Sequence, residues 1–320
     1  MTLNKSPKII FLFSGQGSHY REMGAFLYRN YSCFSAALNQ SDTIIKEYIG
    51  QSIIKEIYEN KDRNFNDLLI THPAIVAIEL AMLDLMEALG IEPDYVVGNS
   101  LGEFAAAVAA GIWTKERALE AAIEQAKSII QEGEEGGMLT IINESKVHFK
   151  PLLEKNQLYV ASENFQNHFT ISGLSADLNA FEEELKKIDT TFLRLSVAYP
   201  FHSPFMEAGK TGFQYYTSSC PPLNGPSKKF ISGLYPGRLD YSLPENYFWR
   251  VISEPTNFSQ LVDFMEGLGE CLYLDLGPSG TMASFVKYNL DPQSNSTILP
   301  IMTPFKREAV QLKSLQTLLK

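Results

Sequence analysis

Short apolar runs alternate with longer helical patterns along most of the chain. Residues 9–13 (IIFLF) and 95–97 (YVV) are apolar at every position, as expected for strands buried on both faces of a parallel sheet. Residues 71–89 are apolar on nearly every face and precede Gly90, which predicts a buried helix. Residues 271–276 predict a late core strand before a tight turn. Together these elements predict an α/β protein with a mostly parallel, helix-covered sheet.

The pattern changes between residues 136 and 197. Strand-like MLTII, a helix, the strands YVASEN and FTISG, a charged helix over 176–187 and the strand FLRLSV follow one another. This order, βαββαβ, predicts a small ferredoxin-like domain. We expect it to span residues 134–197, inserted into a main domain of residues 1–133 and 198–320. The Pro-, Gly- and Ser-rich stretch 218–244 predicts a surface loop.

Composition limits the classes of function. With 320 residues and 45% hydrophobic content the chain can bury a sizeable core. Its net charge of −10 argues against a nucleic-acid partner. Three cysteines without a CxxC pair indicate neither a disulfide framework nor a thiolate metal site. The apolar N-terminal run is too short for a signal peptide or a membrane span, and no other segment approaches about 20 apolar residues. We therefore expect a cytoplasmic protein that has no membrane partner.

The segment GNSLG, residues 98–102, matches G-x-S-x-G between an apolar strand and the helix-forming EFAAAVAAG. In this context the flanking glycines relieve crowding in a sharp turn that lifts a serine above the sheet. Ser100 is therefore the predicted nucleophile. The alternative is a glycine-flanked serine that only caps the following helix.

A serine nucleophile needs a base, and His202 is the best candidate. It lies in AYPFHSPFM, where the chain returns from the small domain to the main sheet. The sequence places His148 in a charged segment, His168 in a polar turn and His72 at a helix start. Any one histidine chosen blindly would more often be an ordinary surface or core residue.

The glycine-rich turn FSGQGS follows the first strand and should lie at the same sheet edge as Ser100. Backbone N–H groups in this turn and the N–H of Leu101 can form an oxyanion hole. A phosphate-binding loop is the alternative. It is disfavoured because the turn lacks both the Lys-Ser/Thr ending of a P-loop and G-x-G-x-x-G spacing.

The segments FSGQGSHY, THPAIVAIE, GNSLGEFAAAVAAG, FTISG, AYPFHSPFM and LDLGPSG occur in this order over residues 9–290. In order and spacing they resemble malonyl-CoA:acyl-carrier-protein transacylases and polyketide-synthase acyltransferase domains. In the residues of these motifs and in its length, the chain looks like the free-standing acyltransferase homologues encoded beside polyketide synthases that lack built-in acyltransferases.

The resemblance implies an α/β-hydrolase-like main domain, a ferredoxin-like subdomain and ping-pong acyl transfer through an acyl-serine. It also implies oxyanion N–H groups from Gln16 and Leu101, and a backbone carbonyl near Val251 that orients the histidine in place of an acid. The implied substrate is a phosphopantetheine thioester on an acyl carrier protein, or an acyl-CoA. No metal or redox cofactor is implied.

Two positions depart from the family pattern. Asn99 stands where G-H-S-L-G has histidine; an amide can hydrogen-bond near the acyl group but cannot titrate. Gln125 stands where malonyl-specific members carry arginine. Helical spacing places Gln125 on an inward face with Ala122, Ala126, Ile129 and Ile130, although an amide filling a core edge would show the same pattern.

The Gln125 departure predicts that uncharged acyl groups are accepted and malonyl is poor. Homologues with this substitution resemble editing hydrolases that release unwanted acyl groups from carrier proteins. An S-acyl or malonyl transferase is the alternative, since the two reactions share their first half. A general esterase is disfavoured by the GQGS loop, and a silent docking protein by the presence of both Ser100 and His202. The candidates for a basic patch that docks a carrier protein are Arg250, Lys287, Lys306 and Arg307, although each alone is more typical of a solvated charge.

Overall fold

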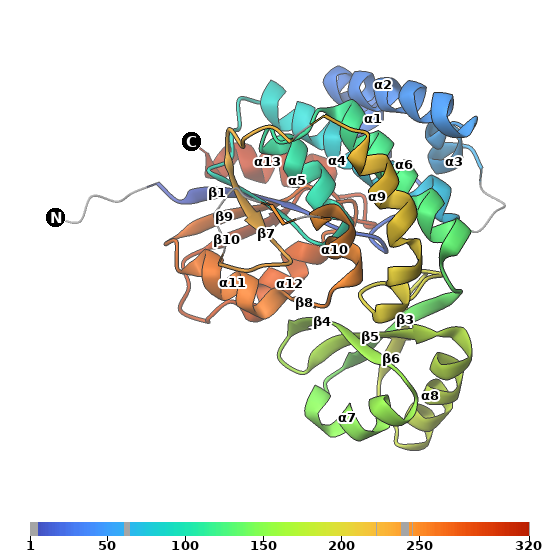
Figure 1. Ribbon diagram of the computed structural model, residues 1–320. Coiled ribbons are helices and arrows are strands. Elements are labelled where there is room, and N and C mark those ends of the chain that lie inside the picture. Colours follow the sequence, from blue (N-terminus) through green and yellow to red (C-terminus); the bar gives the residue numbers. More distant parts are fainter. Residues whose placement is uncertain (1–5, 61–64, 222, 238–242, 245, 320) are drawn as a thin grey trace.

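The computed structural model describes residues 6–60, 65–221, 223–237, 243–244 and 246–319. Two five-stranded sheets form the molecule (Figure 1). One sheet, the main sheet, lies at the centre with helices on both faces (Figure 1). The other contains the strands of the predicted small domain and is called the small sheet; it lies at one end of the molecule with its own two helices outside it (Figure 1). The α/β class and the parallel main sheet predicted from the sequence are both confirmed.

The main sheet is parallel throughout and has the order β10-β9-β1-β2-β7. Its strands are β1 (Lys8–Phe13), β2 (Tyr95–Gly98), β7 (Lys229–Ser232), β9 (Cys271–Asp275) and β10 (Thr297–Pro300). Side chains alternate between its faces: Phe11 and Phe13 belong to the larger core cluster, while Ile10 and Leu12 belong to the cluster on the other face. Because both faces are covered, the strands are apolar at nearly every position.

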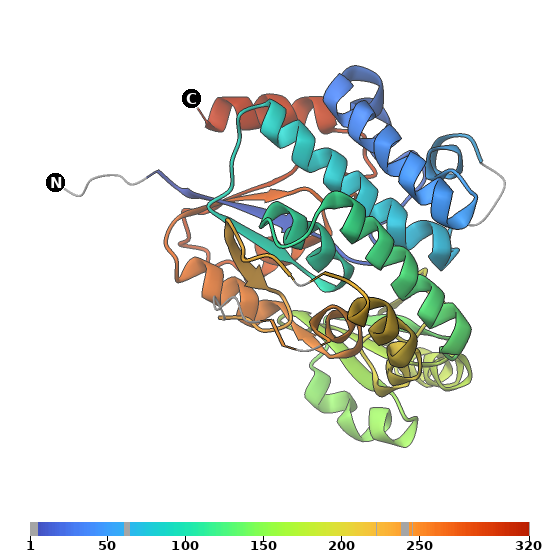
Figure 2. The same cartoon turned by 45° about the horizontal axis from the view of Figure 1, so that its top comes forward.

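Most helices cover the face that carries Phe11 and Phe13, and two cover the other face (Figures 1 and 2). The first group comprises α1 (Ala25–Asn30), α2 (Ser32–Ile49), α3 (Ile53–Tyr58), α4 (Leu68–Ala88), α5 (Glu103–Ala109), α6 (Lys115–Glu132), α9 (Lys210–Ser218), α10 (Tyr247–Ser253) and α13 (Glu308–Leu318). The second group is α11 (Phe258–Glu266) and α12 (Thr281–Asn289).

Helix α4 is the predicted buried helix, and it begins three residues earlier than expected. Asp67 caps it by accepting a hydrogen bond from the Leu69 N–H, and the helix continues through Pro73. The expectation that no segment approaches the composition of a membrane span is wrong for α4. Among the described residues it is the one helix long and apolar enough to cross a membrane, and 83% of that stretch is buried inside the protein. Its apolar faces are those of a core helix.

The second sheet has the order β6-β3-β5-β4-β8. Its elements are β3 (Gly136–Ile142), α7 (Lys146–Lys155), β4 (Tyr159–Phe165), β5 (His168–Leu174), α8 (Ser175–Lys187), β6 (Phe192–Arg194) and β8 (Thr256–Asn257). The first six follow the predicted βαββαβ order. Leu139 and Ile141 pack under α7 and α8, so their neighbours Met138 and Thr140 face the main body. Strand β8 comes from outside residues 134–197 and pairs in parallel with β4.

Two local predictions are wrong. The stretch 218–244 contains β7, a buried strand that pairs with β2 at the edge of the main sheet; part of this stretch lies outside the described residues. Ile130 was predicted to lie on the inward face of α6, but it is 43% exposed. Ser128, two residues earlier on the same helix, is buried. Ala122, Gln125, Ala126 and Ile129 are buried as predicted.

Candidate active site

Ser100 lies at the sharp turn between β2 and α5. It opens a short 3-10 helix (Ser100–Gly102) with φ of 56°, a left-handed conformation that is unfavourable for a side-chain-bearing residue. The turn leaves no room beside it, because a Cβ on Gly98 would lie 2.4 Å from Glu103 Cα and one on Gly102 would lie 2.1 Å from Phe13 O. The two glycines of G-x-S-x-G are therefore required by close backbone packing.

His202 lies beside Ser100 although 102 residues separate them in sequence. Its Nε2 is 3.0 Å from Ser100 Oγ, and its Nδ1 is 2.7 Å from the carbonyl oxygen of Glu254. A carbonyl can only accept, so Nδ1 carries the proton and Nε2 is free to accept from the Ser100 hydroxyl. The pair has the geometry of a nucleophile and its general base.

A backbone carbonyl orients His202, as predicted, and it belongs to Glu254, three residues beyond Val251. Helix α10 ends at Ser253, and Glu254 has an extended backbone (φ −92°, ψ 147°) that directs its carbonyl to the imidazole. The Ile252 carbonyl accepts the backbone N–H of His202 at 2.8 Å. The Glu254 side chain does not orient His202; its carboxylate pairs with Arg250.

Burial controls the charge of His202. Its side chain is almost fully covered, and desolvation lowers its pKa to about 4, partly opposed by the hydrogen bond to Glu254. The ring is therefore neutral near pH 7. A neutral imidazole is the form that can take a proton from a hydroxyl.

The loop after β1 packs directly on the turn of residues 98–102, which we call the elbow. A Cβ on Gly15 would lie 2.8 Å from Ser100 Cβ and 3.2 Å from Leu101 N. Leu101 is in the first turn of the 3-10 helix, where N–H groups have no partner within the helix. The N–H groups of Gln16 and Leu101 thus come from two adjacent segments beside Ser100, as the oxyanion-hole prediction requires.

The base of this loop is held by a buried carboxyl group. Glu79 Oε1 accepts the Ser14 backbone N–H at 2.7 Å, and the Glu79 side chain is fully buried in α4. Desolvation raises the pKa of Glu79 well above its ordinary value. The contact ties the loop after β1 to helix α4.

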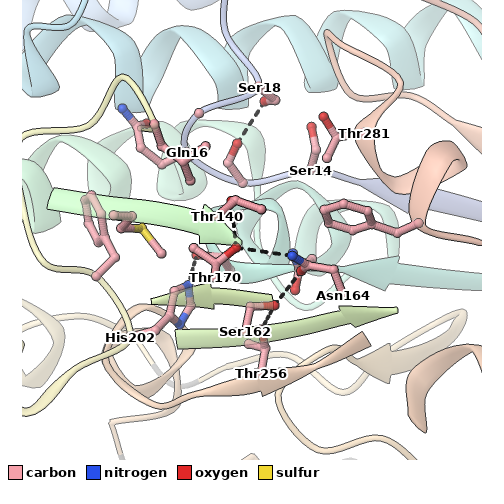
Figure 3. Close-up of a pocket in the computed structure, with 18 of the residues that line it drawn as sticks. Ser14, Gln16, Ser18, Thr140, Ser162, Asn164, Thr170, His202, Thr256 and Thr281 are labelled. Atoms are coloured by element: carbon pink, nitrogen blue, oxygen red, sulfur yellow. Dashed lines mark hydrogen bonds between the residues drawn. The ribbon is translucent and has the colours of Figure 1, made fainter. Parts of the chain in front are cut away.

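Ser100 and His202 open into a cavity of about 360 Å³ between the two sheets. On the side of the small sheet its surface is formed by a hydrogen-bonded group that we call the polar wall (Figure 3). The polar wall consists of Thr140, Ser162, Asn164, Thr170 and Thr256. Their side chains bond to one another at 2.7–3.2 Å. The side chains of Ser14, Gln16 and Ser18 lie opposite (Figure 3).

Asn99 and Gln125 occupy different places relative to this cavity. Asn99 lines it, and its Oδ1 is buried without a hydrogen-bond partner among the described residues. Gln125 is fully buried and is not one of the described residues that line the cavity. Phe201 lines the cavity, His72 stacks on Phe201, and Gln125 contacts His72. Direct contact between Gln125 and an acyl group therefore stays a prediction.

Several residues at or near the cavity were not predicted from the sequence to lie there. His72 lies inside α4, not at its start, and is fully buried between Gln16 and Gln125. His168 is the first residue of β5 and lines the cavity. Part of the polar wall could have been found from the period-two spacing of Ser162 with Asn164 on one predicted strand. No comparable pattern marks His72.

The four basic residues predicted to dock a carrier protein differ in their contacts. Arg250 pairs with Glu254, and Lys306 pairs with Glu22 at 2.5 Å. Lys287, near the end of α12, and Arg307, just before α13, have exposed side chains. Lys287 and Arg307 are thus the better placed of the four to meet an acidic surface.

Comparison with known proteins gives consistent results over nearly the whole chain. Residues 10–319 match the family model described as acyl transferase domain. The polyketide biosynthesis acyltransferase homolog PksD of Bacillus subtilis (strain 168) is 35% identical over 316 residues, covering 97% of this chain and 95% of that protein. The homolog BaeD of Bacillus velezensis is 32% identical, with coverage of 96% and 95%.

Solved structures show the same fold. A loading acyltransferase from the avermectin modular polyketide synthase has a TM-score of 0.86 at 20% identity, covering 98% of this chain and 100% of that one. The malonyl CoA-acyl carrier protein transacylase of Coxiella burnetii has a TM-score of 0.83 at 21% identity, with 98% of each chain covered. Both likenesses are of the fold, at low sequence identity.

Proposed function

Since this chain belongs to the acyl transferase domain family, we propose that it is an editing acyl hydrolase that removes short uncharged acyl groups from acyl carrier proteins in polyketide biosynthesis. Membership confirms the family predicted from the motifs. The similarity to PksD and BaeD supports an acyltransferase-family enzyme of polyketide biosynthesis. The proposal concerns its chemistry, its acyl group and its acceptor.

The chemistry begins with Ser100 and His202. Ser100 Oγ attacks the thioester carbonyl while His202 Nε2 takes the hydroxyl proton, and the N–H groups of Gln16 and Leu101 stabilise the oxyanion. The C–S bond breaks, and His202 returns the proton to the leaving sulfur. Water then attacks the acyl-serine with His202 as base, the C–Oγ bond breaks as His202 returns that proton to Ser100 Oγ, and the carboxylic acid leaves. The 3.0 Å contact between Nε2 and Oγ supports the proton transfers between these two atoms.

The charge of the cavity carries the proposal for the acyl group. None of the described residues that line the cavity is Lys, Arg, Asp or Glu. His168 lines it too, and desolvation lowers its pKa. A malonyl carboxylate in such a site would be a buried unpaired charge, which costs roughly 2–5 kcal/mol, or about 30- to 5,000-fold in preference. Uncharged groups such as acetyl and butyryl carry no such penalty.

A carrier protein is the proposed partner, and the cytoplasm is the proposed location. With a net charge of −10, the enzyme needs a local basic surface to meet an acidic carrier protein, and Lys287 and Arg307 are exposed for that role. The three cysteines are free thiols, as expected in a reducing compartment.

The proposal is tested by loading a carrier protein with acetyl, butyryl or malonyl groups and following its mass after enzyme is added. A second, unloaded carrier protein is included in half of the reactions, and Ser100→Ala is the control. Release of acetyl and butyryl to water, with malonyl retained, is the expected result. Movement of the acyl group to the second carrier protein would make the enzyme a transferase, and efficient use of malonyl would overturn the proposed selectivity.

A further inference from the structure

A line of hydrogen bonds, which we call the relay, runs behind the cavity to helix α6. It starts at the loop after β1, residues 14–18, which we call the oxyanion loop. The Gln16 carboxamide lies 2.8 Å from Thr71 Oγ1 and 3.1 Å from His72 Nδ1. His72 Nε2 is 3.2 Å from Gln125 Oε1, and Gln125 Nε2 donates to the Phe248 carbonyl at 2.6 Å. His72 is the centre of this line, is fully buried, and stacks on Phe201.

The far end of the line determines which nitrogen of His72 carries a proton. The Phe248 carbonyl can only accept, so Gln125 must direct its Nε2 to it and its Oε1 to the ring. An amide oxygen also only accepts. His72 Nε2 must therefore be protonated to bond Gln125, as a donor.

His72 cannot carry a second proton on Nδ1. The ring is completely buried, and desolvation lowers its pKa to about 3. Among the described residues its hydrogen-bond partners are the amides of Gln16 and Gln125, not carboxylates, and burial lowers the pKa of the nearby His19 to about 4. Both rings are neutral near pH 7, so Nδ1 of His72 is an acceptor.

This tautomer requires Gln16 to donate to Nδ1. In the structure the Gln16 oxygen faces Nδ1 and its nitrogen faces Thr71. A half-turn of the carboxamide exchanges the two atoms without moving the rest of the side chain. Gln16 Nε2 then donates to His72, Thr71 Oγ1–H donates to Gln16 Oε1, and every bond in the line has one donor and one acceptor.

We propose that His72 is a positioning residue: as the neutral Nε2–H tautomer it joins Gln125 to the Gln16 side chain and so holds the oxyanion loop against the elbow. Gly15, next to Gln16, leaves no spare space beside Ser100, so a shift of the loop moves an oxyanion N–H. The relay also engages both ends of the Gln125 amide. The proposal rests on the acyl-serine chemistry proposed above, and holds whether water or a thiol takes the acyl group.

The test compares two replacements of His72. His72→Phe keeps a ring against Phe201 but has no hydrogen-bonding atoms, whereas His72→Gln can donate and accept at once. The measurement is the single-turnover rate at which acetyl-carrier protein acylates Ser100, followed by intact-protein mass over a range of substrate concentrations. We expect His72→Phe to lower the maximal rate about 10- to 100-fold with little change in the half-saturating concentration, because a whole oxyanion donor is worth about 10²–10³. His72→Gln should recover most of the rate.

Ser128→Ala is the matched control. Ser128 lies on α6 near Gln125, and within the described part of the chain its hydroxyl bonds to the Glu124 carbonyl of the same helix. We expect the control to acylate at the wild-type rate. Gln125→Leu breaks the relay at its far end and should give a smaller loss than His72→Phe. Thermal unfolding of each variant identifies any that fail to fold.

The outcomes separate this proposal from the proposed function. A His72→Phe enzyme that acylates as fast as wild type overturns the relay alone, as does equal impairment of the Phe and Gln variants. Absence of acyl-Ser100 in the wild type overturns both proposals. Nitrogen-15 NMR of labelled histidine gives a readout independent of activity: a single proton on Nε2 of His72 at pH 7 supports the relay, and a doubly protonated ring contradicts it.

Discussion

The two sides of the cavity position their groups by different means. The side that belongs to the main sheet does so with backbone: Ser100 has φ of 56°, His202 has φ of 58°, and Gly15 touches the elbow. The polar wall on the small sheet instead presents hydroxyl and amide side chains, as in the 3.0 Å contact between Thr140 and Thr170. The first side thus relies mainly on backbone conformation and close backbone packing, and the second on side-chain hydrogen bonds.

This difference indicates how the two sides divide the work. A strained backbone fixes an attacking atom and an oxyanion N–H within narrow limits, which is what bond formation requires. Hydroxyl groups that bond one another can exchange partners with a bound substrate at small cost. We therefore expect changes on the main-sheet side to reduce the rate of chemistry, and changes in the polar wall to affect mainly substrate binding.

The largest expected effect is that of removing the nucleophile. Ser100→Ala should lower the rate of acyl release on the order of 10⁴- to 10⁶-fold, because the remaining groups have no atom to acylate. The measurement is carrier-protein mass over time. Ser172→Ala, which removes a buried β5 hydroxyl with no described partner, is the control and should be near wild type. Equal loss in the two variants would contradict the special role of Ser100.

The next effect concerns the backbone contact between loop and elbow. Gly15→Ala would place a methyl group 2.8 Å from Ser100 Cβ and 2.9 Å from Asn99 O, so the loop must move. We expect a loss of about 10- to 100-fold in the acylation rate, within the value of one oxyanion donor, and destabilisation of about 1–3 kcal/mol. Gly225→Ala meets no atom within 4 Å and is the control. A fully active Gly15→Ala enzyme would show that the contact is dispensable.

The part of this site that follows from local sequence could be predicted. GNSLG between a strand and a helix located Ser100, and the shared sheet edge placed the glycine-rich turn after β1 beside it. Gln16 itself was named by the family resemblance. The βαββαβ order of the small sheet could also be predicted. Most of its strands and both of its helices are long enough to show the strand or helix period of apolar residues.

Features that depend on pairing between segments far apart in sequence, or on the residue at which a helix ends, could not be predicted. Strand β7 has four residues, too few for a visible period, and its partner β2 is more than a hundred residues earlier. The orienting carbonyl at Glu254 depends on where α10 ends, and helix ends are poorly determined by sequence.

His72 was misplaced for a similar reason. The apolar pattern predicted a helix from residue 71, which put His72 at its start. The helix begins at Leu68 instead, and its Asp67 cap and buried packing tolerate the proline. His72 is therefore inside the core.

The acid limb of the pH profile tests the burial of His202. Its pKa is lowered to about 4, so the base form persists to lower pH than for an ordinary histidine. With a pKa of 4 about 90% of the base form remains at pH 5, against about 3% for a pKa of 6.5. We expect the acylation rate to stay nearly constant from pH 7 to 5 and to fall below pH 5. A midpoint near pH 6.5 would mean that the ring is solvated when the enzyme reacts.

The smallest expected effect is in the polar wall. Thr140→Val keeps the shape of the side chain and removes one hydroxyl, and Thr170 retains its bond from Asn164 Nδ2 at 3.2 Å. A hydrogen bond of this kind is worth about 0.5–1 kcal/mol, so we expect KM to rise about two- to fivefold with kcat unchanged. Thr140→Ser, which keeps the hydroxyl, is the control. A fall in kcat comparable to that of Gly15→Ala would show that the polar wall takes part in bond formation, and the division between the two sides would then be wrong.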